Sequence, residues 1–361
     1  MISLASGYGN FSPPAVAVAA ATASLQSGVL AVSPIAGLPA FREALAARYP
    51  AKPVTPEQIV VTAGTKAALF ALLKTVLRPG DEVLLPTPNW FGFWQLIEQA
   101  GGVVRPLSLA ANDDYALTPA TLQAAITPRT RVLLLSNPNN PTGRVYHRAE
   151  LDAVLAVTRR HPSLFVLSDE IYNLITFGEE PVPSLLEWDD PHGQHLVVNG
   201  FSKSLALIGW GVGYLVAPAS VAQACAAWQF ATAAAVPVPT QLAALAATKA
   251  APTIAPDLLT QLAPNRAILL DGLAALSNVC CSHPEATYYA FPDFTTYLDP
   301  KKSPEVASAA LISRLQAAGV AVVDGTSCGA PGFARLSYAV PTVDLQEAVQ
   351  RLHQALTSIL S

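Results

Sequence analysis

Short apolar runs typical of β-strands alternate with segments of helical periodicity from residue 58 to residue 204. Glycine, proline or polar residues end most of the runs, so each is bounded as a separate strand. Neighbouring parallel strands need a long crossover connection, and a helix usually forms it. The alternation therefore predicts an α/β fold: a doubly wound, mostly parallel sheet with helices on both faces. The runs expected to contain strands are 58–63, 82–88, 103–109, 131–143, 164–172 and 195–204.

The pattern changes near residue 249, where the regular alternation ends and a smaller α+β domain is expected. At 361 residues with 52% hydrophobic side chains, the chain is large enough for two domains. We expect an N-terminal arm and part of the small domain at 1–45, the large domain at 46–250, and the small C-terminal domain at 251–361. The last domain should contain a helical stretch with several prolines, an aromatic-rich run at 287–299, a helix near 304–318, the apolar run 320–325 and a helix at 343–360.

Charged residues are few, and their balance argues against nucleic acid as a partner. They make up 13% of the chain, with a formal net charge of -4 and no basic stripe. The first lysine or arginine is Arg42, so the basic start of a secretory signal is missing before the apolar stretch 15–21. The apolar run 205–217 is too short to span a membrane. The four cysteines form no Cys-x-x-Cys pair, which fits a reducing compartment. We expect a cytoplasmic protein that acts on small molecules, without a membrane or metal site.

Lys203 is the only Asp, Glu, Lys or Arg between Pro191 and Thr248. A buried, unpaired ammonium is costly, so other residues usually fill such positions unless the amine has a role. One interpretation is an ordinary lysine whose stem packs while its tip reaches water. The other is a reactive amine, because burial lowers the pKa of a lysine and makes it a better nucleophile toward an aldehyde.

Polar residues follow several of the predicted strands at the point where each strand ends. Ligands bind beyond the carboxyl ends of the strands in an open parallel sheet, so these residues are candidates for one site. A glycine turn before a helix can bind phosphate through backbone amides, although most such turns are only turns. Asp169 could hold a protonated ring nitrogen and Lys203 could form an imine, which is the pattern expected for pyridoxal phosphate. Taken singly, Asp169 could also be a helix or turn cap, and Tyr172 a packed ring. The candidates are Gly64, Thr65, Lys66, residues 137–143, Asp169, Tyr172, Ser202 and Lys203.

Eight motifs, in the correct order, resemble those of the fold-type I pyridoxal-phosphate enzymes, and within them the class I/II aminotransferases. The resemblance runs along nearly the whole chain, and the asparagine loop is its most specific part. It implies an aspartate-aminotransferase-like fold whose large domain binds the cofactor. It also implies an enzyme that moves an amino group from an amino acid to a 2-oxo acid by a ping-pong mechanism. The motifs are SGYGNFSPP (6–14), GLPAFREAL (37–45), VTAGTKAAL (61–69), PTPNWFGF (86–93), NPNNPTG (137–143), SDEIY (168–172), NGFSKSLALIGWGVGY (199–214) and GFARLSYA (332–339).

The resemblance implies a role for each matching residue. Lys203 would form a Schiff base with the cofactor and then carry the proton between the substrate Cα and the cofactor C4′. Asp169 would pair with the protonated ring nitrogen, while Asn140 and Tyr172 would hydrogen-bond the phenolic oxygen of the ring. Arg335 would bind the substrate α-carboxylate in a bidentate fork. Trp90 would stack on the ring; Gly64, Thr65, Lys66, Ser202 and Ser204 would surround the phosphate; Gly7 and Asn140 would contact the substrate.

Two positions depart from the family pattern, and both concern the cofactor phosphate. The family normally has an arginine eight positions after the lysine, where this chain has Gly211. A tyrosine of the partner subunit normally reaches the phosphate where this chain has Val32. Lys66 could supply the missing charge, or the chain could be a divergent enzyme on the same cofactor: a C–S or β-lyase, a decarboxylase or an amino-acid oxidase. A third possibility is a non-catalytic binding relative, but the intact residue set around Lys203 favours an enzyme.

The partners implied by the resemblance are an amino acid, a 2-oxo acid and a second copy of the chain, since family members are homodimers with active sites at the subunit interface. No second arginine lies in a motif assigned to a distal carboxylate, and Tyr8, Phe11 and Trp90 lie in candidate pocket segments. These observations favour neutral or aromatic substrates. Taken singly, Trp90 could also be a core tryptophan, and Arg335 part of a surface salt bridge.

Overall fold

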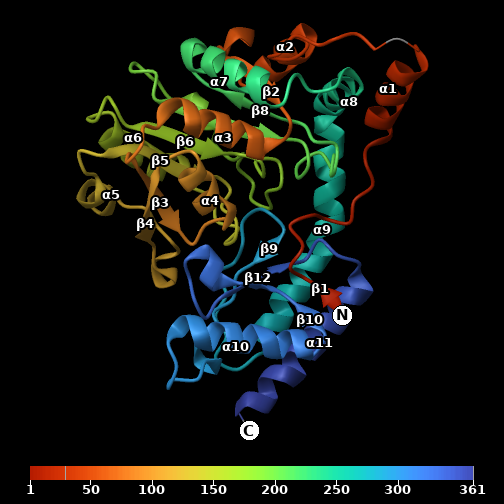
Figure 1. The fold of residues 1–361 in the computed structure, drawn as a ribbon. Helices are drawn as coiled ribbons and strands as arrows, with labels where there is room; N and C mark the ends of the chain where they lie inside the picture. The colour runs from red at the N-terminus through yellow and green to blue at the C-terminus, as the bar shows by residue number, and fades with distance from the viewer. Residues whose placement is uncertain (29, 361) are drawn as a thin grey trace.

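A seven-stranded sheet dominates the fold in the computed structural model, which describes residues 1–28 and 30–360 (Figure 1). The strand order is β2-β8-β7-β6-β5-β3-β4. All neighbouring pairs are parallel except the two that involve β8. The mostly parallel sheet predicted from the alternation is therefore confirmed. The strands are β2 (Ile59–Thr62), β3 (Glu82–Thr87), β4 (Val103–Ser108), β5 (Thr130–Ser136), β6 (Phe165–Asp169), β7 (His195–Gly200) and β8 (Gly213–Val216).

Both faces of this sheet are covered by helices, as predicted. Successive residues of a strand point to opposite faces: in β5, Leu133 and Leu135 pack in one core, while Val132 and Leu134 pack in the other. Burial on both faces explains why the strands read as continuous apolar runs. Helices α1 (Ala15–Gln26), α2 (Pro39–Ala46), α5 (Pro119–Ala125), α6 (Arg148–Thr158) and α8 (Val238–Lys249) join the first core, and α3 (Thr65–Val76), α4 (Gly92–Gln99) and α7 (Ala219–Thr232) the second.

Strand β8 lies inside the apolar run 205–217, which was not among the runs expected to contain strands. Its antiparallel direction follows from the connection that precedes it. Residues 201–212 form turns and loop, so the chain returns from β7 without the crossover helix that a parallel neighbour requires. This return places Lys203 at the carboxyl edge of the sheet.

The C-terminal part forms the smaller α+β unit that the sequence predicted. Its core contains apolar residues from α9, α10 and α11 and aromatic residues from β9. In Figure 1, α9 runs from the neighbourhood of α8 into this unit and lies beside α11. The apolar run 320–325 forms two short strands that pair with different partners, β10 with β1 (Ile2–Ser3) and β11 with β12. The elements are α9 (Ala251–Ala274), β9 (Tyr289–Ala290), α10 (Pro304–Ala317), β10 (Val320–Ala321), β11 (Val323–Asp324), β12 (Ala334–Ser337) and α11 (Thr342–Leu360).

The N-terminal residues contribute to both units. Strand β1 pairs with β10 of the small unit, whereas Ala17 and Ala21 of α1 pack in the core of the large sheet. Helix α2 crosses residue 45, and residue 250 separates α8 from α9. The division into 1–45, 46–250 and 251–361 stays a prediction.

The structure also bears on the apolar and cysteine-containing segments. Within residues 1–28 and 30–360, no helix combines the length and apolar character needed to cross a membrane. The thiols of Cys225, Cys280, Cys281 and Cys328 are free, and those of Cys225 and Cys328 are buried.

Candidate active site

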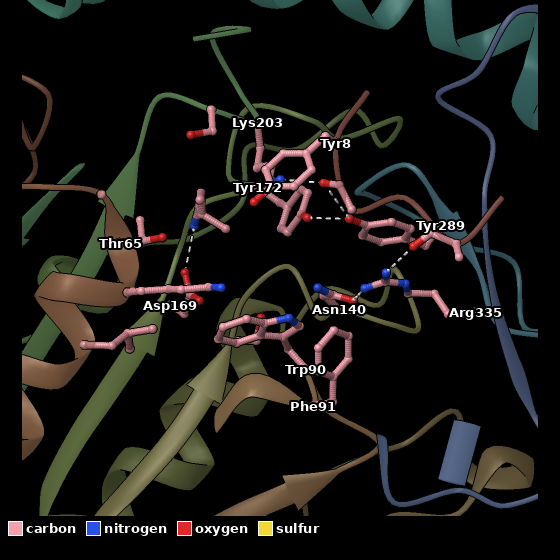
Figure 2. A pocket seen from close by; sticks show the side chains of 18 of the residues that line it. Tyr8, Thr65, Trp90, Phe91, Asn140, Asp169, Tyr172, Lys203, Tyr289 and Arg335 are labelled. Carbon is pink, nitrogen blue, oxygen red and sulfur yellow. Dashed lines mark hydrogen bonds between the residues drawn. The ribbon is translucent and has the colours of Figure 1, made fainter. Parts of the chain in front are cut away.

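A cavity of ≈ 360 Å³ opens at the carboxyl edge of the seven-stranded sheet (Figure 2). Ser136 and Asp169 end β5 and β6, and Lys203 follows β7, so neighbouring strands bring these side chains together. The small unit contributes Tyr289 and Arg335 to another wall. A volume above about 300 Å³ is typical of small-molecule sites. The lining residues that the sequence predicted are Gly7, Gly64, Thr65, Lys66, Trp90, Asn140, Asp169, Tyr172, Ser202, Lys203 and Arg335.

The Lys203 side chain is largely buried and is held by the N-terminal segment. Its Nζ donates a hydrogen bond to the Gly7 carbonyl oxygen and lies 4.1 Å from the centre of the Tyr8 ring. Burial, with a smaller contribution from the Arg335 charge, lowers the pKa of Lys203 to about 8, while Asp169 opposes the shift. With a pKa of about 8, roughly one tenth of this amine is uncharged and nucleophilic at pH 7, far more than for an exposed lysine.

The Asp169 carboxylate lines the cavity and is only 7% exposed. It accepts a hydrogen bond from the backbone N–H of Ile171 at 3.3 Å. Burial raises the pKa of Asp169 to about 7, against the opposing effects of that hydrogen bond and of the Lys203 charge. A carboxylate in this environment favours a ligand that brings a proton, such as a protonated ring nitrogen.

The Arg335 guanidinium is 3% exposed and points toward Asn140 (Figure 2). Its two terminal nitrogens donate to Asn140 Oδ1 at 3.1 Å and to the Ala5 carbonyl oxygen at 3.0 Å. Its Nε finds no acceptor within the described part of the chain. A buried donor without a partner is costly, so this guanidinium is suited to receive a ligand carboxylate.

The turn before α3 forms the part of the cavity suited to an anion. Gly64 has a φ of 86°, a left-handed conformation that glycine adopts at little cost. The first amides of a helix lack acceptors within the helix, and the helix dipole favours an anion there. Gly213 of β8 passes directly against this turn: a Cβ atom at that position would lie 2.8 Å from the Gly64 carbonyl carbon and the Thr65 nitrogen.

Neither of the two positions that depart from the family pattern is among the residues that line the cavity. Gly211 is exposed and has a φ of 62°, and apart from its two chain neighbours no other described residue has a heavy atom within 4 Å of an ideal Cβ position there. Val32 is 95% exposed. Among the residues that the structure describes, the cations that line the cavity are Lys66, Lys203 and Arg335.

One predicted site residue does not line the cavity, and this corrects the prediction. Ser204 is 1% exposed, and its hydroxyl donates to the Ile171 carbonyl oxygen at 2.8 Å. The serine directly after Lys203 therefore points into the protein, whereas Ser202 lines the cavity. Phe11 packs near Tyr288, with ring centres 6.3 Å apart, and is also absent from the lining.

The cavity also contains residues that the sequence analysis did not assign to the site. Phe91 and Ser136 lie inside or beside quoted motifs, so a closer reading of those motifs could have included them. Tyr289 lies in the aromatic-rich run of the small unit, where a tyrosine pair is equally typical of a core. Only the folded chain brings it to the cavity. The lining residues in this group are Ala5, Ala63, Leu69, Phe91, Ser136, Ile171 and Tyr289, whereas Tyr8, which the sequence placed in a candidate pocket segment, also lines the cavity.

The chain is similar to known proteins over nearly its whole length. The sequence model of the family "Aminotransferase class I and II" matches residues 1–352. The aspartate/prephenate aminotransferase of Thermus thermophilus is 34% identical, over 99% of this chain and 91% of its own. The aspartate aminotransferase of Geobacillus stearothermophilus is 30% identical, over 98% of this chain and 91% of its own. A solved structure of the aspartate aminotransferase from Rhizobium meliloti matches with a TM-score of 0.92 at 29% identity, over 99% of this chain and 91% of that chain.

Class I and II aminotransferases depend on pyridoxal phosphate, and the cavity fits this cofactor. Asp169 offers a buried acceptor for the ring nitrogen, Lys203 a nucleophile for the aldehyde, and the start of α3 a phosphate site. The protein is thus a pyridoxal-phosphate-dependent aminotransferase that acts on amino acids and 2-oxo acids, and the chain belongs to the class I and II aminotransferase family.

Proposed function

We propose that Lys203 binds the cofactor covalently and moves the proton at the substrate Cα. The observation that carries this proposal is a buried amine of lowered pKa in the same cavity as Asp169, a buried carboxyl of raised pKa. When bound, pyridoxal phosphate supplies an aldehyde that takes up the amino group and a ring that accepts electrons from Cα. An amine with a pKa of about 8 exchanges a proton readily near neutral pH, as a general acid and base requires.

Three other residues would orient the cofactor ring. Asp169 would hold the proton of the ring nitrogen. The Asn140 Oδ1 atom accepts from Arg335, which leaves its Nδ2 group free to donate to the ring oxygen together with the Tyr172 hydroxyl. Trp90 would cover one face of the ring, and its own orientation is supported by edge-to-face packing against Phe93 with ring centres 5.1 Å apart.

The phosphate would be held by the start of α3, the Ser202 hydroxyl and the Lys66 ammonium. Lys66 is the second residue of α3, and its Nζ lies 5.5 Å from the centre of the Trp90 ring. No arginine of the family pattern is available at Gly211, so Lys66 is the cation that best fits the phosphate. A Lys66→Met variant should weaken the binding of pyridoxal phosphate far more than the binding of pyridoxal, which lacks the phosphate.

For the substrate, we propose that Arg335 binds the α-carboxylate and that neutral or aromatic side chains are preferred. Tyr8 and Phe91 line the cavity and remain 57% and 42% exposed, so an apolar side chain could cover them. An acidic amino acid is the second candidate. Lys66 could bind its distal carboxylate, and similar proteins carry the names aspartate and aspartate/prephenate aminotransferase.

Single-turnover reactions with a panel of amino acids would decide between the two substrate classes. Conversion of the bound cofactor to its amino form by phenylalanine or tyrosine, and not by aspartate or glutamate, supports the first class. If acidic amino acids are the substrates and Lys66 binds their distal carboxylate, Lys66→Met should raise KM for aspartate and leave the affinity for the cofactor unchanged. Release of ammonia and 2-oxo acid without an acceptor would instead indicate a lyase or oxidase.

We also propose that the chain forms a homodimer in the cytoplasm. Val32 and Phe230 are 95% and 76% exposed, and Trp228 is 39% exposed. These apolar side chains come from neighbouring segments, because the Gln229 side chain donates to the Ile35 carbonyl oxygen at 2.7 Å. A second copy of the chain would cover this surface. Light scattering should give twice the chain mass, and Phe230→Asp should shift the protein toward monomer.

The role of Lys203 is tested by the absorbance of the cofactor. Wild-type protein with pyridoxal phosphate should show a visible band from the covalent linkage, and Lys203→Ala should abolish both the band and amino transfer. Circular dichroism should be unchanged, since the variant only shortens a side chain that lines the cavity and introduces no new atoms. A Lys203→Ala protein that keeps the band would overturn the assignment.

A further inference from the structure

Tyr289 occupies a position from which it reaches both the carboxylate-binding and the ring-binding parts of the cavity. In the small sheet it lies directly opposite Ser337, in an antiparallel pair. Residues two apart on a strand point to the same face, so Arg335 shares the face of Ser337 and is a diagonal neighbour of Tyr289. The ring of Tyr289 is completely buried.

The ring of Tyr289 supports the Arg335 guanidinium. The guanidinium carbon lies 4.4 Å from the ring centre, close enough for a cation–π interaction. Because both groups are buried, this interaction is little screened by water. This contact takes up no hydrogen-bond acceptor, and the Nε of Arg335, which has no acceptor within the described residues, remains available to a carboxylate.

The hydroxyl of Tyr289 contacts Tyr172, the residue proposed to donate to the cofactor ring oxygen. The two hydroxyl oxygens lie 2.8 Å apart (Figure 2). Burial raises the pKa of both tyrosines, so each keeps its single proton at neutral pH. Only one of the two can donate to the other, and the direction of that bond decides whether the Tyr172 proton is available to a ligand.

The surrounding contacts favour donation from Tyr289 to Tyr172. Two other groups near the Tyr289 hydroxyl could accept its proton: the Gly7 carbonyl oxygen, at 3.3 Å, and the hydroxyl of Tyr288, a hydrogen-bonding neighbour of Tyr289. The Gly7 oxygen also accepts from Lys203 and from Tyr288, the latter at 3.0 Å, and a carbonyl oxygen has two lone pairs. Tyr289 therefore has its better acceptor in Tyr172, whose own proton is then free to point into the cavity.

We propose that Tyr289 is a positioning residue that directs the Tyr172 proton toward the cofactor ring oxygen and holds the Arg335 guanidinium for the substrate carboxylate. This inference rests on the proposed roles of Tyr172 and Arg335. The two functions reside in different parts of one side chain, and substitutions can separate them.

The first test uses the pH midpoint of the cofactor's visible absorbance, which reports how well the ring oxygen is stabilised as an anion. Tyr289→Phe removes only the hydroxyl and should raise the midpoint by about 0.5 to 1 unit, a roughly three- to tenfold change in proton affinity, as expected for one hydrogen bond. Tyr288→Phe is the matched control, because it deletes a neighbouring tyrosine hydroxyl that donates to the Gly7 carbonyl oxygen at 3.0 Å. It should move the midpoint much less.

The second test uses the 2-methyl derivative of the best amino acid in the panel, which binds but has no Cα proton to lose. Tyr289→Phe keeps the ring and should leave its dissociation constant within about twofold, whereas Tyr289→Leu should weaken binding about three- to thirtyfold. Equal midpoint shifts in Tyr289→Phe and Tyr288→Phe, or no shift in either, would overturn the proposal even if Tyr289→Leu does not fold. Failure of this proposal can be distinguished from failure of the proposed function of the site. If the site does not bind the cofactor through Lys203, the wild-type protein itself would lack the visible band, and the proposed role of Tyr289 would then be wrong as well.

Discussion

Replacing Gly211 by arginine should restore a phosphate ligand that this chain lacks relative to its family. A charged hydrogen bond contributes about 1.5 to 3 kcal/mol, which corresponds to a roughly ten- to hundredfold tighter dissociation constant. Gly211 is exposed, so water and salt screen the new charge, and we expect the lower end, about tenfold. Apart from residue 211 and its two chain neighbours, no heavy atom of the described chain lies within 4 Å of the Cβ position, so the side chain has room.

The substitution also strains the backbone at residue 211, but this strain does not change the affinity for the cofactor. Gly211 has a φ of 62°, and a non-glycine residue in this left-handed conformation costs about 1 to 2 kcal/mol. The strain is present with and without cofactor and therefore cancels in the dissociation constant. It should instead lower the free energy of unfolding of the cofactor-free protein by about the same amount.

The assay is a titration of cofactor-free protein with pyridoxal phosphate and, in parallel, with pyridoxal. Gly211→Arg should bind pyridoxal phosphate about tenfold more tightly than wild type, in line with one screened charged contact. The gain should shrink at high salt and be absent for pyridoxal. Gly211→Ala controls for strain, and Gly211→Gln for side-chain length without charge. Unchanged affinity, or an equal gain for pyridoxal, would show that residue 211 does not reach the phosphate.

Three further predictions concern pH, the turn before α3 and the core. The folded-state pKa of Asp169, about 7, lies above its ordinary value of 3.8, so the folded chain keeps a proton that the unfolded chain releases. The free energy of unfolding of the cofactor-free protein should therefore fall as the pH rises from 3.8 to about 7. Subtracting the free energy of unfolding of Asp169→Asn from that of the wild type at each pH isolates the contribution of Asp169. A difference that stays constant between pH 3.8 and about 7 would contradict the prediction. Gly213→Ala puts a Cβ atom 2.8 Å from the backbone of Gly64 and Thr65, so calorimetry should show a lower Tm. Titration with the cofactor should show a larger dissociation constant. A dissociation constant equal to that of the wild type would mean that the turn does not hold the phosphate. Leu134→Ala should reduce the free energy of unfolding by about 2 to 5 kcal/mol in urea, because Leu134 is 0% exposed. Val103→Ala, at 50% exposure, should have a much smaller effect, and equal losses would place Leu134 outside the core.

Most of the site could be predicted from the sequence because its residues lie at or just beyond the ends of strands. Asp169 directly ends an apolar run and Lys203 follows the next, and parallel strands bring such positions to one edge of a sheet. The glycine turn at Gly64 was visible for the same reason. Ser204 could not be placed, because two serines flank Lys203 and the local turn alone decides which one faces the cavity.

The sequence by itself predicted the fold class, the strand ends and a lone lysine beyond one of them, since these depend on local periodicity and on residue type. The tertiary structure decided what depends on distant segments meeting. The pKa of Lys203 reflects burial together with the charges of Arg335 and Asp169, which are far apart in the chain. Tyr289 reaches the cavity only because β9 pairs with β12, and no local pattern records that pairing. The direction of β8 was likewise decided by the fold, because a strand's partner depends on where its connection allows the chain to return.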